Sequence, residues 1–176
     1  STSPTRRPWT LGRVLAWGVA LSVVGVWGYV MFLSFFVGRA EPRDRLEDDG
    51  FVEAAEATCA PTAAAVAALP FASELDGPSE RADQLDDATA RLEDMVRALR
   101  DVPPPAADDE ALAVERWLAD WEEYNRNRRS YADRFRGGED EPFRVTDRDG
   151  EQIDTAIDEF AHINYMESCE TPDDVG

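Results

Sequence analysis

The chain has 176 residues, enough for one or two small domains. Its 18 basic residues are all arginine and stand against 37 aspartates and glutamates, so the net charge is −19. This acidic balance excludes a protein built to bind nucleic acid, and one histidine with two cysteines leaves little material for a metal site. The charged fraction of 31% and the apolar fraction of 43% are typical of an ordered protein.

No charged residue interrupts residues 14–37, a run of 24. A hydrocarbon core about 30 Å thick takes roughly 20 apolar residues as a helix, so this run predicts a transmembrane helix in the lipid bilayer. A cleaved signal peptide has a shorter apolar region that ends in small residues, whereas Phe32, Phe35 and Phe36 stand at this end. We interpret the segment as a retained signal anchor, with a buried core helix as the alternative.

Three small residues, Gly18, Ser22 and Gly25, lie four and then three positions apart and share one face of this helix. Small side chains at that spacing let a second membrane helix approach closely. This face is therefore the candidate contact with an integral-membrane protein partner. The alternative is that glycine and serine are simply common in membrane helices.

The charges on the two sides of the span indicate its orientation. Residues 1–13 contain no acidic residue and suit a short cytoplasmic tail, whereas 15 arginines and all 37 acidic residues follow the span, a net charge of −22. The anionic cytoplasmic leaflet would repel such an acidic region. We expect a charged connector at residues 38–49 and an acidic domain at residues 50–176 outside the cytoplasm, open to a cationic partner.

Helical patterns cover most of this domain. A first helix is expected from Phe51 to Cys59, and a second, short one over residues 60–70, with Pro61 in its first turn. Apolar residues repeat every three and four positions over residues 79–100, with Ser79 as the N-cap. The longest pattern covers residues 108–135, with acidic residues at its start, arginines near its end, and a Gly137-Gly138 stop.

A short β-hairpin and a final helix complete the predicted domain. Phe143 and Val145 alternate with polar residues, and the dipeptide Asp149-Gly150 indicates a turn within residues 142–153. Apolar positions then return at helical spacing over residues 155–166. The expected fold class is mostly α: one transmembrane helix followed by a small extracytoplasmic helical domain with a short hairpin.

Cys59 and Cys169 are the only cysteines, and they lie near opposite ends of the outer domain. An even pair in an oxidising compartment most simply forms a disulfide, which here ties the first domain helix to the C-terminal tail. Two buried thiols in a cytosolic domain are the alternative. The close C-x-x-C spacing of a redox site is absent.

Trp117, Trp121, Tyr124 and Tyr131 form an aromatic stripe at helical spacing along residues 108–135. Such a stripe usually belongs to the core, but it is sometimes the wall of a pocket that stacks on a ligand. Both interpretations stay open from the sequence. The second makes the protein a tethered small-molecule binding or sensing domain.

No catalytic, cofactor or metal residues are predicted. His162 stands four residues after Asp158, which most simply accepts its hydrogen bond, and no nucleophile, zinc or phosphate-loop motif accompanies it. The sequence DRDG at 147–150 resembles part of a calcium loop, but Val145 and Ala156 would occupy ligand positions that need oxygen. The sequence therefore predicts a protein that is not an enzyme.

The runs WLADWEEYNRNRRSYADRF, PFRVTDRDGEQI and IDEFAHINYMESCETPDDV resemble uncharacterised single-pass membrane proteins of high-GC actinobacteria. The resemblance covers the anchor and most of the outer domain, and it implies a place in the cell envelope without any established activity. With the anchor and the acidic outer domain, it leads to the expectation of an interaction or accessory subunit of an envelope membrane complex.

Overall fold

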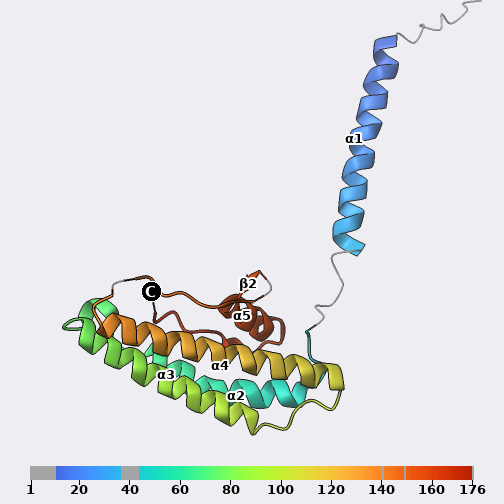
Figure 1. The fold of residues 1–176 in the computed structure, drawn as a ribbon. Helices are drawn as coiled ribbons and strands as arrows, with labels where there is room; N and C mark the ends of the chain where they lie inside the picture. The colour runs from blue at the N-terminus through green and yellow to red at the C-terminus, as the bar shows by residue number, and fades with distance from the viewer. Residues whose placement is uncertain (1–10, 37–43, 140, 149, 176) are drawn as a thin grey trace, which may run out of the picture. The chain divides into compact units, whose positions relative to one another are not determined.

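A computed structural model describes residues 11–36, 44–139, 141–148 and 150–175, and the chain divides into two compact units, Ser1–Glu41 and Pro42–Gly176 (Figure 1). Residues 1–10 of the predicted tail, Val37 and residues 38–43 of the predicted connector lie outside the described residues. Each unit is described by itself below.

The first unit contains the helix α1 (Leu11–Phe36), which covers nearly all of the uncharged segment. Its described side chains, those of residues 17–32, are all exposed. Among the described residues, none of the helices combines the length and the apolar character needed to cross a bilayer. The transmembrane helix expected over residues 14–37 is not supported by this result and stays a prediction.

The second unit begins with α2 (Asp49–Ala67). The Asp48 side chain caps it by accepting a hydrogen bond of 3.0 Å from the Phe51 N–H. The predicted break at Pro61 is wrong, because the helix continues through this residue. Proline removes only one backbone hydrogen bond here, and the turn on either side is rich in alanine, the best helix former.

The helix α3 (Pro78–Arg100) follows a short 3₁₀ turn, Ala72–Glu74. Gly77 is its N-cap with φ of 142°, a conformation that favours glycine, and Pro78 occupies the first turn. The prediction of Ser79 as the N-cap was therefore wrong by two residues. Proline explains the earlier start, because it lacks the N–H that a cap would have to satisfy.

The longest helix, α4 (Asp108–Arg136), has the bounds that the sequence predicted to within one residue and ends at Gly137. Its buried face contains Trp117 and Trp121, whereas Leu112 is 53% exposed and the neighbouring Ala113 takes its place in the core. The side chain of Arg129 joins α4 to α3 by contacting Asp86 and Glu93 at 2.9 Å each.

The predicted hairpin is present but shorter than expected. The strands β1 (Asp147–Arg148) and β2 (Glu151–Gln152) pair antiparallel, with Arg148 opposite Glu151, and Gly150 between them has φ of 90°. Helix α5 (Ile153–Ile163) starts directly after β2 and stops three residues before the predicted end. Tyr165, with a φ of 58°, breaks the helical path before the short 3₁₀ helix η2 (Glu167–Cys169).

The long helices α2, α3 and α4 lie alongside one another, and α5 packs on α4 (Figure 1). The fold is thus mostly helical with a two-stranded hairpin, as predicted. Aliphatic and aromatic residues from these four helices and from the start of η2 meet in one core: Phe51, Ala55, Leu92, Met95, Val96, Leu99, Val114, Trp117, Leu118, Trp121, Tyr124, Ile153, Ile157, Phe160 and Met166, among others.

Candidate functional site

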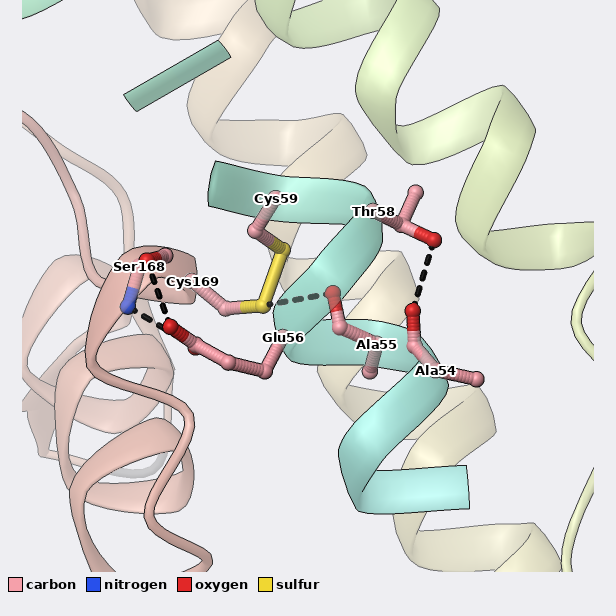
Figure 2. The surroundings of a disulfide bond; sticks show 7 residues. All are labelled: Ala54, Ala55, Glu56, Thr58, Cys59, Ser168 and Cys169. Carbon is pink, nitrogen blue, oxygen red and sulfur yellow. Dashed lines mark hydrogen bonds between the residues drawn. A yellow bond between two sulfur atoms is a disulfide. The ribbon is translucent and has the colours of Figure 1, made fainter. Parts of the chain in front are cut away.

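The C-terminal tail folds back onto the helices and is tied down at several points. The predicted disulfide is present: Cys59 of α2 and Cys169 of η2 are bonded, and both are fully buried. Figure 2 shows the neighbouring Ser168, whose N–H and hydroxyl donate to the Glu56 carboxylate at 3.0 and 2.5 Å. The tail therefore forms a fixed part of the domain surface near α2.

The sulfur atom of Cys169 also lies 3.4 Å from the carbonyl oxygen of Ala55 (Figure 2). This is a contact and not a hydrogen bond, because an oxidised sulfur carries no proton. Further along the tail, the N–H and hydroxyl of Thr171 donate to Asp158 of α5 at 2.6 and 3.0 Å. Burial raises the pKa of Asp158, and these two hydrogen bonds partly oppose that rise.

A buried arginine anchors the end of the tail. Arg128 of α4 is 0% exposed and donates to both carboxylate oxygens of Asp174, at 2.6 and 2.7 Å, and to the Thr89 hydroxyl at 3.0 Å. Its guanidinium also lies 5.7 Å from the Tyr124 ring centroid. Burial raises the Tyr124 pKa to about 12. A bidentate, buried pair of this kind fixes the tail in one position.

The docked tail forms one wall of a groove with a volume of about 400 Å³. We call this feature the tail groove. Its lining combines apolar side chains of α2, α3 and the connecting turn with polar side chains of the tail: Ala63, Val66, Ala67, Leu69, Pro70, Phe71, Arg81, Gln84, Leu92, Met95, Glu167, Ser168, Glu170, Thr171, Pro172, Asp173 and Asp174.

The rim of the tail groove is acidic. Glu167 and Asp173 are exposed and Glu170 is half-buried, whereas Arg81 is the one basic residue among the lining residues. Arg81 donates to the Asp174 backbone oxygen and to the Gln84 side chain. These neutral oxygens hold the guanidinium in place, and the three rim carboxylates outnumber its single positive charge, so the rim is negative on balance.

A second hollow of about 430 Å³ lies between α4, α5 and the hairpin. The stacked rings of Trp117 and Phe160, with centroids 5.2 Å apart, belong to its lining. Asp120, also in the lining, pairs with Arg148 of β1 at 2.5 Å, and burial raises its pKa although Arg148 and Arg116 oppose the rise. The Trp117 indole N–H has no acceptor among the described residues.

The four residues of the predicted aromatic pocket do not share one role. Trp117, Trp121 and Tyr124 belong to the core, and of these Trp117 also borders the second hollow. Tyr131 is half-buried and contacts Phe143 and Phe135, with ring centroids 5.4 and 5.8 Å apart. The structure thus places the stripe mainly in the core, as the first of the two interpretations expected.

His162 has a different environment from the predicted one. Its side chain is 78% exposed and lies 3.7 Å from the Glu170 carboxylate, whereas Asp158 accepts hydrogen bonds from Thr171. No group of histidine, cysteine or acidic side chains within the described residues is arranged to hold a metal ion. The chemistry available in this region is that of the tail groove, a recessed surface with an apolar floor and an acidic rim, which suits binding.

No sequence pattern indicates the tail groove, because its walls come from segments far apart in the chain, residues 63–95 on one side and residues 167–174 on the other. Arg128 is one of the arginines near the end of α4, and it lies four residues after Tyr124 and seven after Trp121. That spacing places it on the buried face. A buried arginine requires an acidic partner, and this was the signal available.

No protein-family model matches the chain, no curated protein matches it, and no solved structure matches it.

Proposed function

We propose that this chain is a membrane-anchored interaction subunit, with α1 in the bilayer and the disulfide-tied domain outside the cytoplasm. The observation that carries the proposal is the exposure of apolar side chains along α1. Its large apolar side chains between Trp17 and Phe32 are at least 50% exposed, and Trp17, Leu21, Val24 and Trp27 are each more than 60% exposed. A continuous apolar surface of this kind is costly in water and requires a cover from outside the helix.

The dimensions of the apolar segment suit a bilayer. The described side chains of α1 are those of residues 17–32, and the uncharged run continues beyond them in the sequence at both ends, over residues 14–37. The helix itself has 26 residues, about 39 Å at a rise of 1.5 Å per residue. A hydrocarbon core of about 30 Å would therefore be spanned with some tilt.

The disulfide supports the location of the domain. Cys59 and Cys169 are bonded, and such bonds persist mainly in oxidising compartments outside the cytoplasm. The net charge of −22 after the span agrees with that side, because anionic lipids of the cytoplasmic leaflet would repel it.

The small-residue face of α1 provides the contact with an integral-membrane partner. A Cβ atom added at Gly18 or at Gly25 would meet no described atom within 4 Å outside the backbone of the helix itself. Together with Ser22, these residues leave a shallow strip along which another helix packs closely. Because exposed charge is screened within about 8 Å at physiological salt, this helix contact supplies the stable part of the association.

Two experiments test the proposal. Protease added to intact spheroplasts is expected to remove the domain, and protection until lysis would show the opposite orientation. In gently solubilised native membranes, replacing Gly18 and Gly25 with leucine is expected to abolish copurification of the partner while membrane insertion stays normal. Retained copurification in the leucine variant, combined with release of the wild-type chain by moderate salt, would contradict the proposal.

A second candidate function, a small-molecule sensor, is favoured by one observation. The Trp117 indole N–H lacks an acceptor among the described residues and belongs to a side chain at the wall of the second hollow, beside Asp120. Trp117 is 2% exposed, so a ligand bound in the hollow would change its fluorescence by altering the wall that the side chain forms. A Trp117→Phe variant that keeps the fluorescence response to a candidate ligand would exclude this site.

A further inference from the structure

We propose that the tail groove binds an apolar, basic segment of a partner protein, a proposal that rests on the function proposed above and identifies its recognition surface. The floor of the groove is apolar: Val66 of α2 and Leu92 and Met95 of α3 are buried side chains that belong to its lining. Methionine adapts to differently shaped side chains, which suits a floor that receives a partner.

The groove is long enough for a peptide segment. Its lining on α3 extends from Arg81 to Met95, fourteen residues or about 21 Å along a helix axis. An extended chain covers that distance with about six residues at roughly 3.3 Å each.

Phe71 supplies an anchor at the turn after α2. It is 78% exposed, the most exposed large apolar side chain among the described residues, and it belongs to the groove lining. The turn that holds it is fixed: the Phe71 N–H donates to Glu74 at 3.0 Å, and the Gln84 amide donates to the Pro70 oxygen at 2.8 Å. A large aromatic side chain on a fixed backbone turn loses little backbone entropy when a partner covers it.

The acidic rim defines the charge of the partner segment. Glu167, Glu170 and Asp173 place three carboxylates along the tail wall beside the apolar floor. The single basic residue of the lining, Arg81, is held by the backbone oxygen of Asp174 and the side chain of Gln84, so negative charge predominates. Lysine or arginine side chains flanking apolar ones match this distribution.

The same charges disfavour the other occupants of an apolar groove. A second copy of this domain, with its net charge of −22, would bring like charges together at the rim. Anionic lipid headgroups would be repelled for the same reason. The groove therefore fits a cationic protein segment best.

The test uses the full chain in micelles of a neutral detergent and a fluorescently labelled peptide of twelve residues that contains only leucine and lysine. Binding is followed by fluorescence anisotropy at physiological salt, with empty micelles subtracted. The wild-type chain is expected to bind this peptide and not its counterpart with glutamate in place of lysine. Phe71→Ser is expected to weaken binding about tenfold, as for an interface anchor.

Matched variants separate the groove from general attraction to an acidic protein. Leu112→Ser removes an exposed apolar side chain of α4 that lies outside the groove lining, and it is expected to leave the affinity unchanged within a factor of about two. Glu167→Lys with Asp173→Lys is expected to weaken binding more than Glu53→Lys with Glu115→Lys, which changes the net charge equally at exposed sites outside the lining.

Three results would overturn the proposal: no binding by the wild-type chain, equal losses for the groove and control variants, or equal binding of the glutamate peptide. None of them bears on the anchor. Spheroplast proteolysis and the copurification experiment test the proposed function separately. Failure of the groove proposal can therefore be distinguished from failure of the membrane-anchor proposal.

Discussion

The two longest helices, α1 and α4, differ in the environment of their apolar side chains. In α4, one face with Trp117 and Trp121 enters the core while charged residues cover the other face. In α1, apolar residues surround the helix and every described side chain is exposed. Helix α4 therefore buries its apolar face within its own unit, whereas the apolar surface of α1 has no cover among the described residues of its own unit.

The largest expected effect concerns the bond that ties the domain together. Replacing Cys59 and Cys169 with alanine opens a loop with a sequence separation of 110 residues. The chain-entropy model then predicts a loss of about 4–5 kcal/mol in the free energy of unfolding. Urea denaturation measures it, and wild-type protein with reductant is the control that should behave alike. Unchanged membrane association in the same variant would confirm that the two units are stabilised independently; an unchanged urea midpoint would contradict the prediction.

A charge in α1 tests the other half of the comparison. Val24 lies near the middle of the uncharged segment, and Val24→Arg is expected to disfavour membrane insertion by about 3 kcal/mol, as for arginine at the centre of a membrane helix. Resistance to extraction by alkaline carbonate measures insertion. The matched variant Leu112→Arg places the same charge at an exposed position of α4 and should extract like wild type. If Val24→Arg and Leu112→Arg resist alkaline extraction equally, the proposal that α1 anchors the chain in the membrane is contradicted.

The buried pair of Arg128 and Asp174 is expected to show an asymmetric response. Asp174→Ala leaves Arg128 buried without its carboxylate, and we expect a loss of about 2 kcal/mol, below the 3–5 typical of fully buried pairs because Asp174 is 14% exposed. Arg128→Met releases Asp174 to water with the tail and should cost less. Thermal unfolding of both variants and of the double variant measures the difference. Equal losses would show that the tail stays docked without the pair.

The sequence was sufficient for features that depend on neighbouring residues. The bounds of α4 follow from its acidic start, its apolar period and Gly137, and the hairpin turn follows from Gly150. The break predicted at Pro61 was wrong because a proline usually ends or starts a helix. Here the alanine-rich flanks favour helix on both sides of Pro61, and the core contacts and disulfide of α2 favour the same continuous helix.

The tail groove could not be predicted from the sequence, because it depends on contacts between residues far apart in the chain. Its tail wall depends on Arg128 meeting Asp174 and on Ser168 meeting Glu56, pairs separated by 46 and 112 residues. With 37 acidic residues in the chain, no pattern indicates which one an arginine selects. Only the cysteine pair, the only two cysteines in the sequence, predicted that the tail packs against α2.

The smallest expected effect is a pH dependence at the seam between α3 and α4. Hydrogen bonds from Arg129 lower the pKa of Glu93, and burial, which would raise the Asp86 pKa, is outweighed there by Arg136 and Arg129. A carboxyl whose folded pKa is depressed stabilises the fold above its ordinary pKa, and that contribution is lost as the pH falls through the folded value. The wild-type chain should therefore lose stability below about pH 4.5.

Arg129→Gln is expected to remove part of this acid loss and to cost about 1 kcal/mol or less near neutral pH, since the three side chains are about one-third exposed and partly screened. Burial raises the pKa values of Asp120 and Asp158, which stabilises the fold as the pH falls, but both chains share that contribution and it cancels in their difference. Urea midpoints of both chains between pH 3 and 7, with the exposed Arg91→Gln as a control of equal charge, measure the effect. A constant difference across this range would show that Arg129 acts on the seam through packing alone.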